Sequence, residues 1–346
     1  MGAIIENRHG GPEALTRSEV PAPVPRSREV LIRVHAAGIN RADALQRRGF
    51  YPPPAGASAI YGLEVAGVIE AVGEGVSVEN RGTPVMALLA GGGYADYVTV
   101  PVDHVLPVPE QLSFAEAAGI PEVAATVYSN LVLTCGMSMN PAENLKEDGE
   151  PAVVLVHGGT GGIGVHAIQL ALAAGTRVFA TVSTEEKAEY VRSLGAEPII
   201  YTEHSFHEVL LAETGGRGAD YILDVVGGKY LDDNLHTLAD GGHLCIIGLM
   251  GGAKVEVNLG YMLSRRLSVH ATSLRTRSDH QKAEILRGVR EHVLPLIESG
   301  RIGVGLDRIF DMEEAAAAHE YFDSGSIAAR LCCAWSRNRC APAVLF

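Results

Sequence analysis

The sequence predicts an α/β protein in which an irregular, mostly antiparallel, barrel-like β domain is joined to a doubly wound parallel sheet. From residue 3 to about residue 121, apolar and polar residues alternate as they do in half-buried strands. Beyond residue 121, short apolar strands alternate with helical patterns, which is typical of a doubly wound sheet. Residues 153–156 are apolar and run into a glycine cluster and then a helical pattern, so we expect a strand, a tight turn and a helix in succession.

The expected elements follow this order along the chain. Strands are predicted at residues 30–37, 62–72 and 94–100, with loops at Pro21, Pro23, Pro25 and Pro52-Pro53-Pro54, where no ladder can continue. The second domain has predicted strands at residues 153–157, 177–182, 198–201, 221–226, 243–248 and 267–272. Helices are predicted at residues 163–174, 185–194, 206–213, 282–298 and 313–322, and a further strand at residues 306–310.

These patterns suggest three segments. Residues 1–121 form the first part of the β domain, and residues 122–265 form the parallel-sheet domain. Residues 266–346 complete the sheet and return to the first domain, because alone they are too few for a core. The polar stretch within residues 135–150 is expected to be a surface loop, and residues 332–346 show no clear periodicity.

The glycine cluster fits the dinucleotide fingerprint, as Gly159-x-Gly161-x-x-Gly164 between a strand and a helix. Missing side chains let the backbone turn sharply and approach a pyrophosphate, which the helix N-terminus favours. The alternative is an ordinary glycine-rich turn. The candidate cofactor-binding residues of the turn are Gly158, Gly159, Thr160, Gly161, Gly162, Ile163 and Gly164.

The second strand of this domain indicates which nicotinamide nucleotide is bound. It ends at Ser183 without the carboxylate that usually bonds the ribose of NAD. Ser183 and Lys187, one helical turn apart, suit a 2′-phosphate, so we predict NADPH over NADH. Alternatively, Ser183 and Glu186 form a capping box and Lys187 is solvated. Nearby Glu185 and Glu186 oppose a phosphate unless they point away.

Composition excludes several classes of function. The net charge of −13 argues against nucleic acid or an anionic membrane as a partner. No apolar run reaches membrane-spanning length, and the five cysteines form neither a CxxC pair nor an obvious disulfide framework. We therefore expect a reduced, cytoplasmic protein.

Six short stretches together carry a specific family resemblance. They are residues 38–43, 62–67, 120–122, 157–164, 248–252 and 272–275. With the domain order, they make the chain similar to the medium-chain dehydrogenase/reductase superfamily, and within it to the zinc-free, zeta-crystallin-like quinone oxidoreductases. The resemblance implies a GroES-like catalytic domain and a Rossmann NADP-binding domain.

The resemblance also implies that no catalytic zinc is bound. Where the zinc-dependent relatives have a cysteine and a Gly-His-Glu motif, this chain has Asn40 and Leu63, and the cysteine lobe for structural zinc is absent. An amide and an aliphatic side chain do not replace zinc ligands. We expect acceptors that take a hydride without a Lewis acid, and Glu64 has no metal to serve.

Further site residues follow from the resemblance and from topology. Asn40 and Tyr51 approach the nicotinamide end, and their amide and phenol are suited to bond a quinone oxygen. The remaining candidates line the substrate pocket (Asp43, Tyr61, Thr126) or the cofactor site (Tyr201, Gly248, Leu249, Met250). Alternatively, Asn40 and Asp43 cap a short helix through residue 48, Tyr51 is a packed loop aromatic, and Thr126 bonds its own helix.

Three functions remain open on the sequence. The first is an NADPH-dependent quinone oxidoreductase without zinc or flavin, and the second is a reductase of activated C=C bonds in alkenals, enones or enoyl thioesters. A carrier-bound thioester needs a basic entrance, for which the candidates are Arg41, Arg47 and Arg48, otherwise a solvated helix face.

The third function is a slow or inactive NADPH-binding sensor or structural protein. Relatives end with Ile-Gly-Lys before an apolar strand, whereas this chain has Ile327-Ala328-Ala329-Arg330 in an atypical tail, residues 328–346. A poorly formed last strand would expose Cys332, Cys333 and Cys340 to oxidation. The resemblance also predicts a homodimer through a sheet edge near residues 243–248.

Overall fold

A computed structural model describes residues 1–6, 8–325 and 329–335. The chain forms two compact units. The first contains Met1–Glu122, Arg275–Leu286 and the chain from Leu306 onward, and the second contains Val123–Leu274 and Arg287–Gly305. Ile327 and Cys340 lie outside the described residues.

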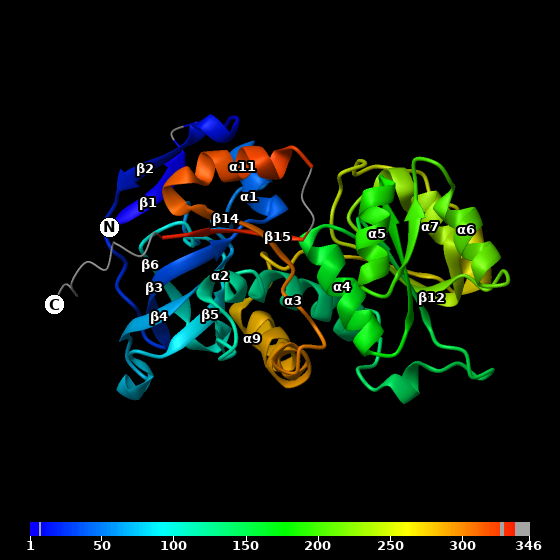
Figure 1. The fold of residues 1–346 in the computed structure, drawn as a ribbon, viewed down its shortest axis with the longest axis horizontal. Coiled ribbons are helices and arrows are strands. Elements are labelled where there is room, and N and C mark those ends of the chain that lie inside the picture. Colours follow the sequence, from blue (N-terminus) through cyan, green and yellow to red (C-terminus); the bar gives the residue numbers. More distant parts are fainter. Residues whose placement is uncertain (7, 326–328, 336–346) are drawn as a thin grey trace. The chain divides into compact units, whose positions relative to one another are not determined.

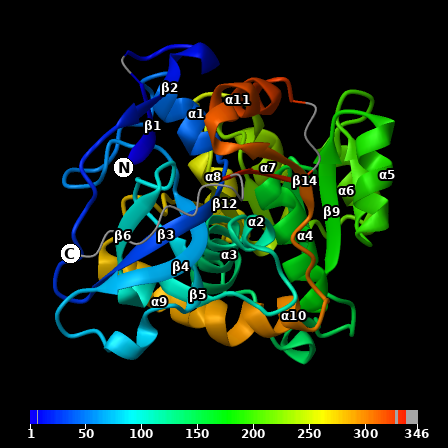
Figure 2. The same ribbon diagram turned by 60° about the vertical axis from the view of Figure 1, so that its left-hand side comes forward.

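The first unit is built on a seven-stranded sheet, confirming the predicted β domain. The strand order is β14-β15-β3-β4-β5-β7, and β6 pairs with β3. All of these pairs are antiparallel except β14 with β15. The strands are β3 (Glu29–Gly38), β4 (Glu64–Val72), β5 (Pro84–Leu88), β6 (Tyr97–Pro101), β7 (Val105–Pro107), β14 (Leu306–Asp311) and β15 (Arg330–Ala334), and β1 (Gly2–Glu6) pairs with β2 (Leu15–Glu19) separately. Strands β3, β4 and β5 run side by side in Figures 1 and 2.

The alternation in β3 explains how this sheet forms. Val30, Ile32 and Val34 are buried, and the residues between them are partly exposed. The buried residues pack into one core with Tyr61 and Tyr94. The helices of the unit are α1 (Arg41–Arg47), α2 (Phe114–Ala117), α11 (Ala315–Asp323) and the 3₁₀ turns η1 (Pro12–Ala14), η2 (Val78–Asn80), η3 (Val102–His104) and η8 (Met312–Glu314).

The last strand corrects the expectation of a poorly formed tail. Strand β15 pairs with β14 on one side and β3 on the other, joining chain segments far apart in sequence (Figure 1). Cys332 and Cys333 are fully buried within it. Burial raises the pKa of the Cys332 thiol to about 11, so neither exposure nor thiolate character favours oxidation.

The second unit is the predicted doubly wound sheet. Its six strands are all parallel, in the order β10-β9-β8-β11-β12-β13. They are β8 (Val153–His157), β9 (Arg177–Val182), β10 (Glu197–Ile200), β11 (Ala219–Asp224), β12 (Leu238–Ile246) and β13 (Ser268–Ala271). The strand predicted as the edge, near residues 243–248, is β12, and it is internal. Strand β12 pairs with β11 on one side and with β13 on the other, so β13 is the edge strand at this end of the sheet.

Helices cover both faces of this sheet. Helices α4 (Gly162–Ala173) and α5 (Glu185–Ser193) lie on one face, and α6 (Phe206–Glu213) and α7 (Leu231–Thr237) on the other (Figure 1).

The helix that was predicted at residues 282–298 is divided into three parts. These are α9 (Asp279–Gly288), a π-helical turn η7 (Val289–Val293) and α10 (Leu294–Glu298). The remaining elements are α3 (Pro121–Val127), the π-helical η4 (Tyr128–Thr134), η5 (Pro141–Asn144), η6 (Gly228–Tyr230) and α8 (Leu259–Arg265).

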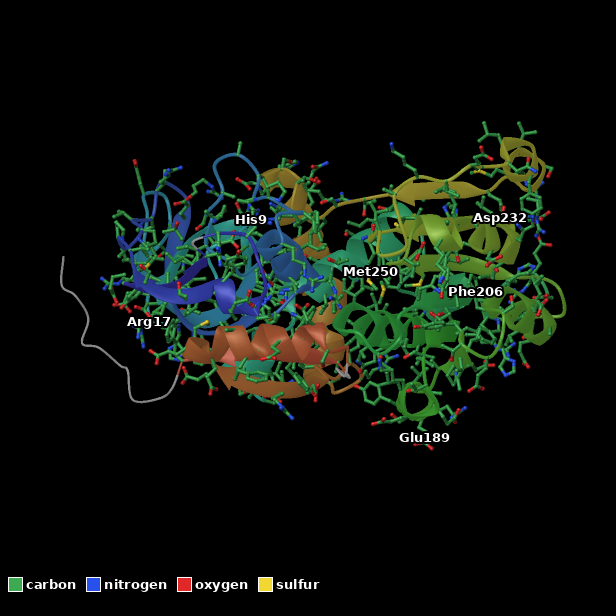
Figure 3. All side chains as sticks on the ribbon, turned by 90° about the horizontal axis from the view of Figure 1, so that it is seen from above. His9, Arg17, Glu189, Phe206, Asp232 and Met250 are labelled. Atoms are coloured by element: carbon green, nitrogen blue, oxygen red, sulfur yellow. The ribbon has the colours of Figure 1, made fainter. Side chains whose placement is uncertain are left out.

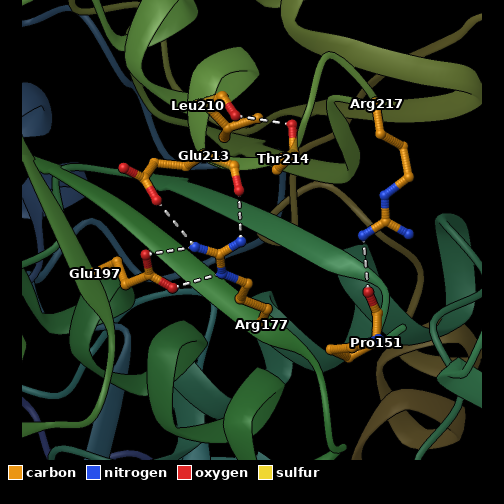
Figure 4. A network of polar contacts seen from close by, with 7 residues as sticks. All are labelled: Pro151, Arg177, Glu197, Leu210, Glu213, Thr214 and Arg217. Carbon is orange, nitrogen blue, oxygen red and sulfur yellow. Dashed lines mark hydrogen bonds and ion pairs between the residues drawn. The ribbon is translucent and has the colours of Figure 1, made fainter. Parts of the chain in front are cut away.

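Polar contacts fasten the strands to these helices away from the turn. Arg177, at the start of β9, donates two hydrogen bonds of 2.6 and 2.8 Å to Glu197 of β10 and one of 2.8 Å to the carbonyl of Glu213 (Figure 4).

Phe206 is the first residue of α6 and packs in the core of the unit (Figure 3). Its ring centroid lies 4.8 Å from that of His157.

The polar insert within residues 135–150 is mostly exposed and carries the short η5, but it is anchored at one point. Asn144 is buried and donates to the carbonyls of Ser138 and Ala174, both at 2.8 Å. No helix among the described residues is both long and apolar enough to cross a membrane.

Candidate functional site

The glycine turn at residues 158–164 has the tight geometry that its sequence predicts. Gly158 has a φ of +74°, which side chains rarely adopt. A Cβ on Gly159 would lie 2.8 Å from the Cβ of Ala180, and one on Gly164 would lie 2.2 Å from the carbonyl oxygen of Gly158. Absent side chains therefore let α4 start directly against the strands.

The N-terminus of α4 is open. Its N-cap is Gly161, which has no side chain to cap the helix. Val165 donates to the carbonyl of Gly161 at 2.9 Å, but no described residue accepts from the N–H groups of Gly162, Ile163 and Gly164. Free N–H groups at the positive end of a helix dipole suit an anion such as a pyrophosphate.

A buried polar network that includes His157 supports the turn from beneath. Thr181 accepts from the N–H of Gly158 at 3.2 Å and lies 3.1 Å from Nδ1 of His157. Nε2 of His157 lies 2.7 Å from Oδ1 of Asn234, whose amide donates to Asp224 at 3.2 Å. This order requires the neutral Nε2–H form of His157, and burial lowers its pKa to about 4.

Asp224 closes this network at the end of β11. Its carboxylate accepts from the N–H groups of Val226 at 2.6 Å and Gly227 at 3.0 Å, shaping the following loop. Burial raises its pKa to about 6, although both N–H groups favour the charged form.

The end of β9 corrects the expected helix cap. Thr184, rather than Ser183, is the N-cap of α5, and its hydroxyl accepts from the N–H of Lys187 at 3.3 Å. Ser183 therefore does not cap the helix, and its carbonyl accepts from Thr202 at 3.1 Å. The N–H of Tyr201 bonds the carbonyl of Val182, which brings the half-exposed Tyr201 beside the end of β9.

The acidic residues near Ser183 are exposed. Glu185 pairs with Arg192 at 2.5 Å, so its charge is compensated on the helix surface.

The loop after β12 carries the other residues that are predicted to contact the cofactor. A Cβ on Gly248 would lie 2.6 Å from the carbonyl oxygen of Val225, and Leu249 and Met250 are exposed by 57% and 67% (Figure 3).

In the first unit, three buried side chains form what we call the Asn40–Glu64–Arg330 cluster. Arg330 is ion-paired with Glu64 and donates to Oδ1 of Asn40 at 3.0 Å, and Nδ2 of Asn40 donates to Glu64 at 2.9 Å. Arg330 only donates and Glu64 accepts, so the orientation of the amide is fixed. Gly38 makes room, because its Cβ would lie 2.2 Å from Oε1 of Glu64.

Asn40 and Asp43 confirm the capping alternative. They form a capping box at the start of α1, and Asp43 accepts from the N–H groups of Asn40 at 2.8 Å and Gly62 at 3.1 Å. Burial is the largest cause that raises the pKa of Asp43 to about 6. Both oxygens of the Asp43 carboxylate accept backbone hydrogen bonds. The Asn40 amide donates one hydrogen to Glu64, and its second hydrogen has no acceptor among the described residues.

Arg275 holds the loop that carries Tyr51. It donates to the carbonyl of Tyr51 at 3.3 Å, to Gln46 at 2.8 Å and to the carbonyl of Ala90 at 2.9 Å. Its guanidinium also lies 5.4 Å from the centroid of the Tyr51 ring. Tyr51 is thus a fixed loop residue that is partly exposed.

The two other predicted pocket residues are buried. Tyr61 lies in the core of the first unit, with its ring centroid 6.3 Å from that of Tyr94, which indicates a packing role. It is also near Asp43: burial first, and the charge of Asp43 among the further causes, raise the pKa of its phenol. Thr126 belongs to the second unit, where its carbonyl accepts from Asn130 at 2.7 Å. Within the first unit, the structure therefore brings Asn40, Asp43 and Tyr61 together.

The basic side chains of α1 are not a simple solvated face. Arg41, Arg47 and Arg48 all pair with Asp323, and Arg47 is fully buried. The prediction of a solvated face is therefore wrong for Arg47. The single carboxylate of Asp323 offsets only one of these three positive charges, and burial withdraws Arg47 from any entrance.

Sequence reasoning missed Arg330, Arg275 and Glu122 as members of the first unit's polar groups. Glu122 donates its N–H to Glu64 at 2.9 Å, and burial followed by the charge of Asp43 raises the pKa of its carboxyl to about 8. The sequence held one sign of the role of Arg330. It is a basic residue at the position of the lysine in the family's Ile-Gly-Lys pattern.

Comparison with known proteins agrees with this fold. Residues 26–110 match the alcohol dehydrogenase GroES-like domain, and residues 162–287 match the zinc-binding dehydrogenase domain. The pig (Sus scrofa) quinone oxidoreductase is 31% identical over 92% of this chain and 93% of its own. A GroES-like domain combined with a Rossmann sheet defines a nicotinamide-dependent oxidoreductase.

Solved structures give the same result. A crystal structure of Escherichia coli quinone oxidoreductase complexed with NADPH has a TM-score of 0.82, at 30% identity over 96% of this chain and all of that one. The CurK enoyl reductase has a TM-score of 0.83, at 26% identity over 97% and 99% of the two chains. The chain belongs to the medium-chain dehydrogenase/reductase family.

Proposed function

We propose that this enzyme oxidises NADPH and reduces a quinone, without zinc or flavin. The observation that carries the proposal is the combination, in the second unit, of an open glycine turn with a second strand that ends in Ser183. The first feature suits a dinucleotide and the second suits a 2′-phosphate. The relatives named quinone oxidoreductase support the acceptor class.

The preference for NADPH rests on three side chains around the end of β9. Because Thr184 caps α5, the hydroxyl of Ser183 is left for a ligand, and Lys187 follows in the first turn of that helix. Tyr201 adds a phenol beside them. No carboxylate occupies the position that would bond a 2′-hydroxyl and repel a phosphate.

In the first unit, Asn40 is proposed to bind the acceptor. When bound, NADPH supplies a hydride to an electron-poor carbon or oxygen. Glu64 and Arg330 fix the Asn40 amide, and its second N–H is then oriented to donate to an oxygen that gains negative charge. Tyr51, held by Arg275, is the second proposed donor.

Zinc-independence follows from the same residues. Position 40 is an amide committed to two charged partners, and Leu63 is a buried aliphatic side chain. Neither is a zinc ligand, and Arg330 already compensates the charge of Glu64. A reaction that needs a metal to acidify an alcohol is therefore disfavoured.

Reduction of an activated C=C bond is the second candidate, supported by the enoyl reductase among the similar structures. A carrier-bound thioester is less suited to this chain, because Arg47 is buried and Asp323 offsets one of the three arginine charges of α1. We also propose a homodimer through β13, which has no second strand partner among the described residues. Exposed apolar side chains lie on β13 and on the nearby α8 (Leu259, Leu263, Val269).

Steady-state kinetics test the reaction and the nucleotide together. Purified protein is mixed with NADPH or NADH and with an ortho-quinone, a para-quinone or an α,β-unsaturated aldehyde, and loss of reduced nicotinamide absorbance is followed. Rapid oxidation of NADPH by a quinone supports the proposal. Faster turnover of the aldehyde favours the second candidate, and binding without turnover favours a sensor.

A charge substitution tests the site. Ser183→Asp is expected to raise KM for NADPH about tenfold or more, through a loss of about 1.4 kcal/mol or more, with little change for NADH. Ser205→Asp is the matched control, since Ser205 is the N-cap of α6 and aspartate caps equally well. An equal effect on both nucleotides would contradict the assignment.

A further inference from the structure

Three side chains of the second unit converge although no sequence motif connects them. His243 lies on β12, His270 on β13, and Cys135 directly follows the π-helical η4. One ligand atom of each lies within 4.8 Å of both others. We propose that Cys135, His243 and His270 form a zinc-type metal site, distinct from the predicted cofactor contacts.

The sheet register brings the two histidines together. Cys245 lies opposite His270 in the parallel pair β12–β13, and His243 is two residues before Cys245. Side chains two residues apart point to the same face of a sheet, so both imidazoles lie on one face. Their rings are nearly parallel, with an angle of 5° between planes.

The distance between the histidines fits a shared tetrahedral metal. Nδ1 of His243 and Nε2 of His270 are 3.3 Å apart. Two nitrogens at about 2.0 Å from zinc, at a tetrahedral angle, lie about 3.3 Å apart. A hydrogen bond between neutral imidazoles also explains this one distance, but it does not explain why a cysteine sulfur completes a triangle with them.

The third position belongs to a buried thiol. Cys135 is 3% exposed and has a side-chain hydrogen bond with the neighbouring Cys245, which itself donates to Oδ1 of Asn130 at 3.0 Å. Metal binding at Cys135 would replace its hydrogen bond with Cys245, and the proposed site leaves its fourth position to water. The half-buried histidines give the metal a path from solvent.

The donor set selects the metal. One thiolate and two imidazoles, without a carboxylate, suit zinc and exclude magnesium or calcium. Binding replaces the thiol proton of Cys135 by the metal and releases it to solvent, with no change of oxidation state. Lys146, whose charge acts on His243, is paired with Asp220 at 2.5 Å, so its charge is compensated.

The expected role is structural. The metal would tie η4 to the edge of the sheet, where β13 has a strand partner on only one side within the part of the chain that the structure describes. The same region is joined by Asn130, whose Oδ1 also accepts from Thr272 at 2.6 Å. Because Asn130 holds the carbonyl of Thr126, the site would stiffen the helix that carries a predicted pocket residue.

Cobalt titration of the full-length protein tests the site. After treatment with a chelator, Co²⁺ is expected to bind with one equivalent per chain and to give both a thiolate-to-cobalt charge-transfer band and intense tetrahedral visible bands. Zn²⁺ should displace it. We expect a Kd of about 1 µM or tighter for Zn²⁺, weaker than four-ligand structural sites.

Substitutions test which side chains bind the metal. Cys135→Ser should abolish the charge-transfer band, and His243→Gln and His270→Gln should each weaken binding about tenfold or more, whereas His204→Gln, an exposed histidine of the same unit, should not. If Cys135→Ser does not fold, judged by circular dichroism, His270→Gln carries the test.

Binding without a thiolate band, or equal binding by all variants, would overturn the proposal. Loss of the band in Cys245→Ser but not in Cys135→Ser would overturn the ligand assignment. NADPH oxidation is expected to change less than twofold when zinc is removed, so failure of this site and failure of the proposed reaction are separately visible.

Discussion

The glycine turn of the second unit and the Asn40–Glu64–Arg330 cluster of the first are built in opposite ways. The turn offers backbone N–H groups, and its residues are adjacent in sequence. The cluster consists of charged and polar side chains that are separated by up to 290 positions. One site is therefore made by leaving side chains out, and the other by burying them.

This difference determines how each site fails. A methyl group added at Gly164 collides with the main-chain carbonyl of Gly158, which has little room to move. Removal of one partner from the cluster leaves a buried charge uncompensated, which is more harmful than removal of both. Substitutions at the two sites should consequently differ in whether a second change can rescue them.

The largest effect is expected for the cluster. Arg330→Met leaves Glu64 buried without its ion pair and should lower the free energy of unfolding by about 3–5 kcal/mol. Addition of Glu64→Gln removes the orphaned charge, so the double variant should regain about half or more of this loss. Urea denaturation of the parent, both single variants and the double variant measures the coupling. A double variant less stable than Arg330→Met would contradict a buried ion pair.

The second effect concerns the glycine turn. In Gly164→Ala, the new Cβ lies 2.2 Å from the carbonyl oxygen of Gly158, so the helix must shift. We expect a loss of about 1–3 kcal/mol in stability and at least a tenfold loss in NADPH affinity. Thermal denaturation and fluorescence titration measure the two quantities.

Gly161→Ala is the matched control for that substitution. Its φ is −72° and its nearest neighbour for a Cβ is 3.6 Å away, an ordinary contact. NADPH affinity in this variant should fall less than in Gly164→Ala by about fivefold or more. Equal losses would mean that the dinucleotide, rather than helix packing, restricts both positions.

The same contrast explains what the sequence could predict. The parallel sheet and the glycine turn were both predictable because they depend on local patterns. The clustering of Asn40, Glu64 and Arg330 was not, since it depends on the return of β15 beside β3. Likewise, burial of Arg47 depends on Asp323, far along the chain.

Two local signals were present but ambiguous. Both Ser183 and Thr184 are good N-cap residues, and only the backbone shows that Thr184 caps α5. The edge strand was also misplaced by one, because strand order is not encoded in the periodicity of any single strand. The cofactor residues thus follow from sequence more readily than their detailed roles do.

A third prediction concerns Glu122, whose N–H bonds to Glu64 of the cluster. Burial raises its pKa from 4.5 to about 8, so the folded state keeps a proton that the unfolded chain releases. The stabilisation is therefore present below pH 4.5 and is lost as pH rises toward about 8. Glu122→Gln should flatten this slope and be about 1–2 kcal/mol more stable than the parent at pH 8.

The control is Glu110→Gln, at an exposed position of the same unit. Urea denaturation of both variants and the parent at pH values from 5 to about 8.5 isolates the contribution of Glu122, because the other buried acids are common to all three. A difference between Glu122→Gln and the parent that does not change with pH would show that the carboxyl is already charged when buried.

The smallest effect is expected at Ala329, which precedes Arg330 of the cluster. Its φ is +92°, a conformation that favours glycine, and the family's Ile-Gly-Lys pattern has glycine at this position. Ala329→Gly should relieve this strain and stabilise the protein by about 1 kcal/mol in urea denaturation. Ala334→Gly, at the end of the strand β15 that follows Ala329 and without a positive φ, should instead destabilise it by about 0.5–1 kcal/mol. If both variants are destabilised, the strand has adapted to alanine, and the buried Arg330 is held without backbone strain beside it.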